Sequence, residues 1–227
     1  MGSYLAPKIR KLQKGKRLLI LEGPSDKDVL EAFYRKLHGT WPDNIVVWER
    51  AGNSFEGRKH GRKQLFQELA AEIKGLRGIS IEDRDDNLPY TEVAENLSIP
   101  GKGPSRLKQM IWKRRNLENY LLLPVAIARA CKAEEEEVRE YLLRVHGYAI
   151  PGSFQAADCH PSLALIDGKK IMSSLPDCVR SEFGVEASEI AQAMLENEIP
   201  EDMITAIRAI HELQAAMVAT PQPVGGN

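Results

Sequence analysis

Three short apolar segments, each followed by glycine or polar residues, constrain the fold of this sequence more strongly than any other feature. They are residues 17–21, 45–48 and 78–81, and their lengths are typical of buried strands. Between them, apolar residues recur at helical spacing over 29–37 and 65–76. This order of elements predicts right-handed crossovers and a mostly parallel sheet flanked by helices.

The second half of the sequence is helical in pattern. A fourth candidate strand, 107–112, precedes it, and prolines interrupt it at several points. The expected helices are 125–132, 134–145, 169–174, 188–196 and 201–218. We therefore expect an α/β domain over 17–120 and a smaller all-helical domain over 121–219.

The two ends are left outside these domains. Residues 1–16 are interpreted as the remnant of an expression tag followed by a basic lead-in, and 220–227 as a disordered tail rich in proline and glycine. The abrupt start suggests a fragment of a longer protein.

The composition excludes several classes of protein. Hydrophobic residues make up 43% and charged residues 28% of the 227 residues, which is an ordinary globular balance. The sequence contains neither an apolar stretch of membrane-spanning length nor a signal-peptide core. Cys131, Cys159 and Cys178 are widely spaced, so we expect free thiols in a cytoplasmic protein that makes no membrane contact.

Charge is distributed unevenly along the chain. Residues 1–120 hold 23 basic against 16 acidic side chains, whereas residues 121–227 hold 8 against 16. A basic half that also carries clustered carboxylates suits an enzyme acting on a polyanion. The alternative is that such asymmetry carries no function in a two-domain chain.

Two basic clusters contribute most to this asymmetry, and either one has the simpler interpretation of a solvated surface. Without interleaved aromatic residues, they indicate contact with a phosphate backbone rather than stacking on bases. The clusters are Arg50, Arg58, Lys59, His60, Arg62 and Lys63, and Lys102, Arg106, Lys108, Lys113, Arg114 and Arg115. The residues expected to bind DNA are Arg58, Lys59, Arg62, Lys63, Lys113, Arg114 and Arg115.

Carboxylates follow two of the predicted strands. Glu22 ends the first, Asp83 and Asp85 end the third, and Asp26 lies four residues after Glu22. Ligands of open parallel sheets bind at the carboxyl ends of the strands, where these like charges would converge unless a cation neutralises them. Oxygen ligands favour Mg²⁺ or Mn²⁺. Each motif taken alone is an everyday acidic turn.

The segment from Leu19 to Glu22-Gly23, together with Asp83-Arg84-Asp85, resembles the TOPRIM domain of topoisomerases, primases and several nucleases. The resemblance implies a Rossmann-like sheet and metal binding by the glutamate and the two aspartates. Gly52 fits the family's glycine turn after the second strand.

A narrower resemblance concerns residues 114–124, which contain Glu118-Asn119-Tyr120 and look like a segment of the OLD (overcoming lysogenization defect) nucleases. Those proteins place an ABC-type ATPase before a TOPRIM nuclease. This chain has no Walker A motif, so the resemblance implies an ATPase domain only in the full-length parent. Asp167-Gly168-Lys169-Lys170 is similar to a lysine-bearing segment of the same nucleases.

The combined hypothesis is a two-metal DNA endonuclease or nickase. Glu22, Asp26 and Asp85 are expected to hold one Mg²⁺ or Mn²⁺ ion, and Asp83 and Glu118 the other. Asp86 is a spare ligand or, like Gly52, a neighbour of the ligands.

Lys169 is expected to stabilise the charge that develops on the scissile phosphate. Tyr120 is expected to be packed in the core rather than to act as a nucleophile. Two alternatives remain open, namely a DNA-binding scaffold inactive without its ATPase and an RNA-cleaving enzyme. A homo-oligomer of the full-length protein is compatible with all three.

Overall fold

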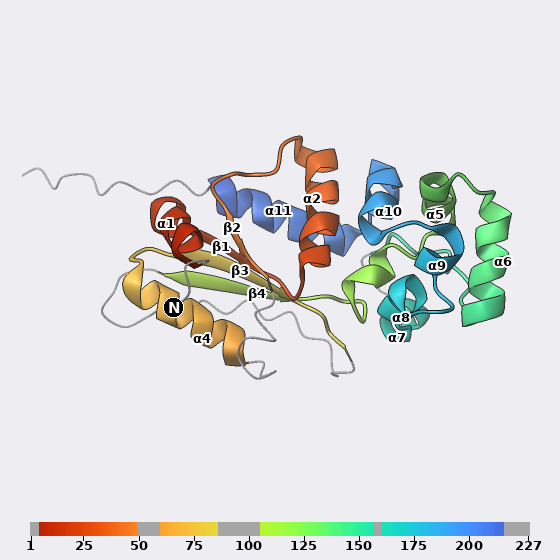
Figure 1. Cartoon of the computed structure of the whole chain (residues 1–227), viewed down its shortest axis with the longest axis horizontal. Coiled ribbons are helices and arrows are strands. Elements are labelled where there is room, and N and C mark those ends of the chain that lie inside the picture. The colour runs from red at the N-terminus through yellow and green to blue at the C-terminus, as the bar shows by residue number, and fades with distance from the viewer. Residues whose placement is uncertain (1–4, 50–59, 86–104, 157–159, 216–227) are drawn as a thin grey trace, which may run out of the picture.

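The computed structural model describes residues 5–49, 60–85, 105–156 and 160–215 (Figure 1). Its centre is a four-stranded sheet with the order β2-β1-β3-β4. The strands are β1 (Arg17–Ile20), β2 (Val46–Trp48), β3 (Arg77–Glu82) and β4 (Arg106–Ile111). All neighbouring pairs are parallel, which confirms the predicted α/β sheet and its fourth strand.

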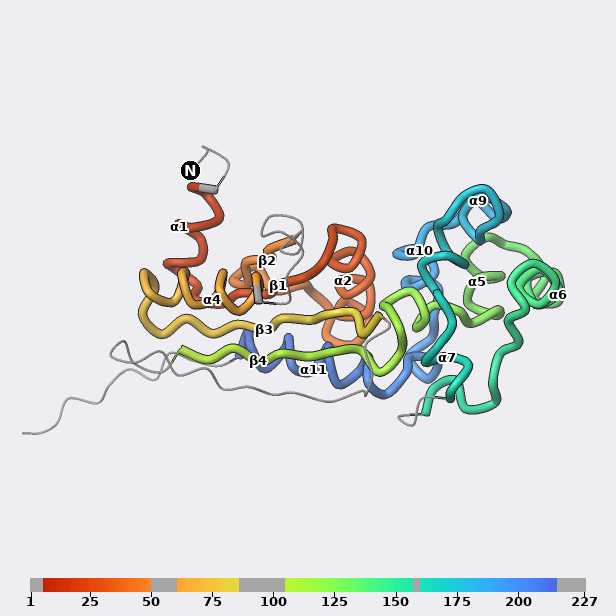
Figure 2. Tube along the Cα trace, turned by 90° about the horizontal axis from the view of Figure 1, so that it is seen from below, coloured from red at the N-terminus to blue at the C-terminus, as the bar shows by residue number. Residues whose placement is uncertain are grey.

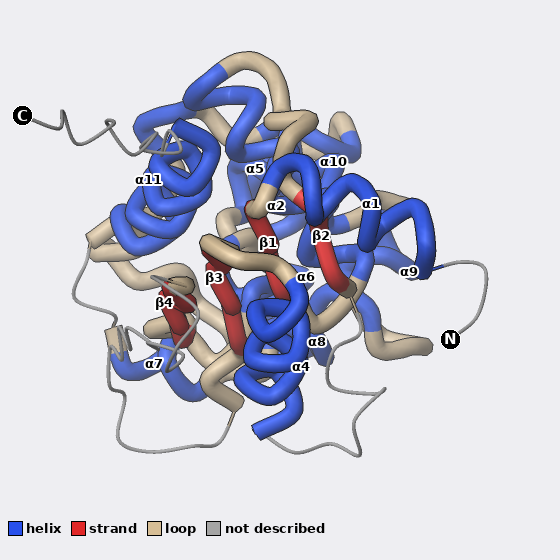
Figure 3. The backbone as a smooth tube through the Cα atoms, turned by 90° about the vertical axis from the view of Figure 1, so that its left-hand side faces the viewer, coloured by secondary structure: helices blue, strands red, loops and turns tan. Residues whose placement is uncertain are grey.

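Helices cover both faces of the sheet. On one face lie α2 (Pro24–His38) and α11 (Glu201–Ala215), and on the other lie α1 (Leu5–Gly15) and α4 (His60–Glu72) (Figures 1 and 3). Alternate residues of a strand point to opposite faces, so β1, β2 and β4 supply side chains to two hydrophobic cores, whereas β3 supplies Ile79 and Ile81 to one of them.

The two cores can be read from the burial of the strand residues. Leu19 and Ile79 belong to the core under α2 and α11. Leu18 and Ile20 belong to the core under α4 and α1. Gly78 allows α4 to approach, because a Cβ there would lie 3.0 Å from the Phe66 ring.

A helical region follows β4 and extends away from the sheet (Figure 2). Its elements are η1 (Leu117–Tyr120), α5 (Pro124–Cys131), α6 (Glu135–His146), α7 (Pro161–Leu165), α8 (Gly168–Ser173), α9 (Val179–Phe183), α10 (Ala187–Ala193) and η2 (Glu196–Glu198). The five helices expected here and in α11 lie within a few residues of their predicted bounds. The two short helices α7 and α9 were not predicted.

The helical region shares its hydrophobic core with the sheet. α10 contacts both α2 and α5, and α11 returns to lie against β1 and β3. One cluster of buried side chains runs from Leu19 in β1 to Ile190 in α10 and Ile210 in α11. The last helix thus belongs to the sheet layer, although its residues lie in the stretch expected to form a separate domain.

None of the helices in the described ranges is both long enough and apolar enough to span a bilayer.

Candidate functional site

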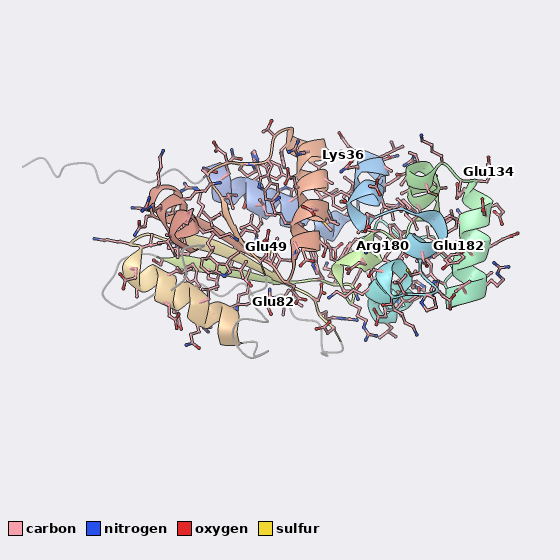
Figure 4. The ribbon with its side chains drawn as sticks, in the orientation of Figure 1. Lys36, Glu49, Glu82, Glu134, Arg180 and Glu182 are labelled. Atoms are coloured by element: carbon pink, nitrogen blue, oxygen red, sulfur yellow. The ribbon has the colours of Figure 1, made fainter. Side chains whose placement is uncertain are left out.

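Acidic side chains gather at the carboxyl ends of the strands, as the sequence predicts. Glu22 follows β1, Asp83 follows β3, and Glu118 lies in η1 shortly after β4. Lys169, on α8 of the helical region, reaches the same point. The site therefore lies where the sheet meets the helical region, and Figure 4 labels Glu82 at this end of β3.

Glu22 is held through one of its two carboxylate oxygens. Its Oε1 accepts hydrogen bonds from Nη2 of Arg62, at 2.9 Å, and from the backbone N–H of Asp83, at 3.3 Å. Arg62 also donates to the Ile81 carbonyl at 2.6 Å. The second oxygen, Oε2, lies 3.5 Å from Nζ of Lys169. Arg62 thus fixes Glu22 to the end of β3 and leaves one oxygen facing the site.

Asp83 is buried between the sheet and η1, with 3% of its side chain exposed. Oδ1 accepts the backbone N–H of Leu117 at 3.1 Å, and Oδ2 accepts a hydrogen bond from Lys169. Burial, followed by the charge of Glu22, raises the pKa of Asp83 to about 7, although Lys169 acts in the opposite direction.

Glu118 and Asp26 complete the acidic cluster. Burial raises the pKa of Glu118 to about 7, with Asp26 and Asp167 contributing in the same direction. Its Oε2 is buried and has no hydrogen-bond partner among the residues that the structure describes. Oδ2 of Asp26 accepts the N–H groups of Glu22 and Gly23 at 3.1 and 3.3 Å, and burial raises its pKa as well.

Lys169 is a cation of this cluster. Burial alone would lower its pKa, but the hydrogen bond to Asp83 and the nearby charges of Glu118 and Glu22 raise it above the ordinary value. Two cations, Lys169 and the Arg62 guanidinium that holds Glu22, thus face four carboxylates, and acidic groups outnumber basic ones in the cluster. We define these four residues, Glu22, Asp26, Asp83 and Glu118, as the carboxylate cluster.

A turn locked by Asn119 places Lys169. The fully buried Asn119 donates to the carbonyls of Leu163 and Ile166, at 2.7 and 2.8 Å, and accepts the N–H of Gly168 at 3.0 Å. A Cβ at position 168 would lie 2.3 Å from Oδ1 of Asn119. Only glycine therefore fits where α8 begins, directly before Lys169.

The carboxylate cluster fits a hard divalent cation in the chemistry of its donors. All four side chains offer oxygen, and one of those oxygens is buried without a partner among the described residues. Burial and like charge raise the pKa values of three of the four, Asp26, Asp83 and Glu118. In the stretches that the structure describes, no three Asp, Glu, His or Cys side chains are already arranged to hold an ion. Binding would require Lys169 to move away from Asp83.

Asp85 lies apart from the carboxylate cluster. Its side chain is exposed, its φ of 52° is in the left-handed region, and its N–H donates to the Arg115 carbonyl at 2.9 Å. The structure instead groups Asp83 with Glu22, through the shared contact with Lys169. The expected division of ligands between two ions therefore stays a prediction, without support from Asp85.

Other predicted residues fall outside the described ranges. They are Gly52, Arg58, Lys59 and Asp86.

Two of the arginines expected to bind DNA have other roles, which corrects the sequence interpretation. Arg62 is 6% exposed and holds Glu22. Arg114 is 1% exposed, donates to the carbonyls of Asn119 and Phe154, and lies 4.6 Å from the Tyr120 ring centroid. Neither guanidinium group is accessible to DNA. The sequence prediction failed because local spacing alone does not distinguish a buried arginine from an exposed one.

The remaining predicted contacts keep some exposure. Lys63, Lys113 and Arg115 are half-buried, and Arg115 contacts Asp167 at 3.8 Å. Tyr120 is fully buried and donates to Asp202, which confirms the prediction that it is packed in the core.

Sequence reasoning missed the roles of Arg62 and Asn119. Asn119 directly follows Glu118 and accepts a hydrogen bond from Gly168. Both residues lie in motifs that the sequence analysis singled out, so a contact between these motifs could have been predicted. Arg62 offered none, because its partner Glu22 lies 40 residues away.

Comparison with known proteins gives no match to a protein family, to a curated protein or to a solved structure.

Proposed function

We propose that this chain is a divalent-metal-dependent nuclease that hydrolyses phosphodiester bonds in DNA. The observation that carries the proposal is the carboxylate cluster, in which four acidic side chains gather around Lys169 with only Arg62 as a second cation. Such a cluster costs folding free energy unless it serves a bound cation. The resemblance of the motifs at Glu22, Asp83 and Glu118 to TOPRIM and OLD nucleases points to the same chemistry.

The carboxylate cluster would hold Mg²⁺ or Mn²⁺, through Glu22, Asp83 and Glu118 with Asp26 beside them. When bound, such an ion activates water and stabilises a leaving oxygen. The separation of Asp85 from the cluster makes one ion the better supported number.

The chain's own residues supply binding and proton transfer. Lys169 is within reach of both Glu22 and Asp83, so its ammonium can pair with a phosphate oxygen that approaches the cluster. Burial raises the pKa of Glu118 to about 7 in the metal-free protein, so binding of an ion would release a proton from this carboxyl group near neutral pH. Arg62 orients Glu22 through its ion pair, and Asn119 orients Lys169 through the turn at Gly168.

A plasmid-cleavage assay tests the proposal. We expect the chain to nick or linearise supercoiled DNA with Mg²⁺ or Mn²⁺, without ATP, and to be inactive in EDTA. D83N should abolish cleavage while the circular dichroism spectrum is unchanged. E137Q is the matched control, because Glu137 is exposed in the first turn of α6, outside the cluster. Normal cleavage by D83N would overturn the assignment.

A second candidate is a gated DNA-binding module that needs an ATPase domain for cleavage. The contact between Lys169 and Asp83 favours it, because an ammonium on Asp83 competes with a metal ion. Metal-independent DNA binding with cleavage only after an ATPase partner is added would favour this candidate. Cleavage of RNA but not of DNA would favour the ribonuclease alternative.

A further inference from the structure

A row of arginines crosses the opposite edge of the sheet, where the strands begin. Arg17, Arg77 and Arg106 are the first residues of β1, β3 and β4, and the strand register pairs Arg17 with Arg77 and Arg77 with Arg106. Neighbouring strands are about 4.8 Å apart, and like charges at paired positions destabilise a sheet. Negative charge near the row would therefore stabilise the sheet.

The positive charge of Arg17 is compensated by backbone carbonyl groups within the protein. It is 7% exposed, and its guanidinium donates to the carbonyls of Gly15 and of Gln214 in the last turn of α11, at 2.5 and 3.2 Å. A helix end of this kind carries partial negative charge. Burial, followed by the charge of Arg77, still lowers the pKa of Arg17. Arg17 is thus structural, and its charge adds to the field of the row.

Arg77 and Arg106 have no comparable compensation. Arg106 is exposed and Arg77 half-buried, and neither forms an ion pair with an acidic side chain in the described ranges. Four lysines lie on neighbouring elements at this edge, which Figure 3 views with α1, α4 and α11 around the strands. We define the amino-end surface as Lys11, Lys14, Lys16, Lys74, Arg77 and Arg106.

The surface is strongly basic. Asp43 lines a hollow together with Lys11, Lys14 and Arg17. With Glu72 and Glu212 in the last turns of α4 and α11, these acidic residues are outnumbered by the six cations of the amino-end surface. No acidic residue occurs in α1, whose sequence is LAPKIRKLQKG. A field of one sign over several elements attracts a polyanion rather than a single small anion.

The chemistry of the surface favours DNA over an anionic membrane. Stable attachment to a lipid surface needs apolar side chains that insert beside the charges. The large apolar side chains exposed in the described ranges lie instead in the helical region. They are Leu143, Val145, Leu165, Leu175 and Leu195.

We propose that the amino-end surface is a second contact for the phosphate backbone of double-stranded DNA, separated from the carboxylate cluster by the length of the sheet. The choice of DNA as the bound polyanion rests on the proposed function. From Arg17 to Glu22 there are about five residue steps of about 3.3 Å, or roughly 17 Å. Duplex DNA rises about 3.4 Å per base pair, so the two contacts are about five base pairs apart.

This spacing makes the proposal a statement about substrate length. A duplex of about five base pairs only just spans the distance between the two contacts, whereas a duplex of about twelve base pairs extends past both and offers each of them several phosphates. We therefore expect affinity to rise on lengthening across this range, and the rise to depend on the amino-end surface.

Fluorescence anisotropy with hairpin-capped duplexes of about 5 and about 12 base pairs tests this in EDTA, where no cleavage occurs. The test variant is K74Q/R106Q, which removes two exposed charges of the surface. The matched control is R144Q/R208Q, which removes two exposed charges on α6 and α11. Each phosphate that the protein neutralises contributes about 0.9 to the magnitude of the slope of log affinity against log salt concentration.

For K74Q/R106Q we expect a salt slope on the longer duplex that is shallower by about 1.8, and loss of the affinity gained on lengthening. The control should match the unmodified chain. An unchanged slope in K74Q/R106Q, or an equal loss in the control, overturns the proposal. Binding to anionic vesicles that depends on Lys74 and Arg106, with no such dependence for DNA, also overturns it.

Plasmid cleavage is measured in a separate assay, so the nuclease proposal and the proposed second DNA contact can fail independently of each other. If the salt slope changes as expected but no metal ion supports cleavage, the surface stands and the nuclease proposal fails. If cleavage depends on Asp83 while K74Q/R106Q binds DNA as the unmodified chain does, the nuclease stands and the surface fails.

Discussion

Replacing Glu118 with glutamine should stabilise the metal-free protein at alkaline pH. The pKa of Glu118 is raised from 4.5 to about 7 by burial, so the folded state binds a proton more tightly than the unfolded state does. Glu118 therefore supports folding fully below about pH 4.5, and this contribution is lost as pH rises towards 7. A shift of about 2.5 pKa units corresponds to about 3 kcal/mol.

Glutamine keeps the shape of Glu118 and removes the charge. We expect E118Q to exceed the unmodified chain in unfolding free energy by about 2–3 kcal/mol at pH 8 in EDTA, and by much less at pH 5. Urea titrations followed by circular dichroism, at pH 5, 6, 7 and 8, measure this difference. E137Q, in the first turn of α6, is the control and should change stability little at any pH.

Added Mg²⁺ should narrow the difference at pH 8. At a free concentration of one hundred times Kd, a ligand stabilises the folded state by about 2.7 kcal/mol, and E118Q should gain less because one ligand is lost. The reasoning is refuted if the stability of E118Q and that of the unmodified chain vary with pH in parallel, since Glu118 would then titrate alike in both states.

Three further changes test the supports of the site. G168A should lower unfolding free energy by about 2–4 kcal/mol in urea titrations, because its Cβ would overlap Asn119; an unchanged midpoint would mean that the turn before Lys169 adapts freely. R62K should reduce cleavage by about 10- to 100-fold, since lysine cannot hold both Glu22 and the Ile81 carbonyl. Plasmid nicking measures this, and full activity would remove Arg62 from the site. R114M should cost about 3 kcal/mol in thermal unfolding by removing a buried charge with its hydrogen bonds, and a changed DNA salt slope at equal stability would contradict its placement in the core.

Local patterns predicted the sheet well, because each strand is a short apolar segment bounded by polar residues. The bounds of β1, β2 and β3 lie within a residue or so of the predicted ones. The same logic placed Glu22 and Asp83 at one edge, since carboxyl ends of parallel strands meet there. These predictions depend on neighbours along the chain.

The misplaced residues depend on contacts between distant segments. The sequence pattern predicts that Arg62 and Arg114 contact DNA, yet both are buried, and their partners Glu22 and Phe154 each lie 40 positions away along the chain. Asp85 follows Asp83 by two residues, but a left-handed φ of 52° turns the chain away from the site. The return of α11 to the sheet was likewise invisible, because an amphipathic helix does not reveal which surface it will cover.

The return of α11 also sets the order in which this protein can fold. The hydrogen bond from Arg17 to the carbonyl of Gln214 joins residues 197 positions apart, and α11 covers the face of β1 and β3 that carries Leu19 and Ile79. During synthesis the part of that apolar face that α2 does not cover stays exposed until almost all of the described chain has been made. Contacts of such long range slow folding. We therefore expect a chain shortened before residue 201 to expose this part of the sheet and to aggregate.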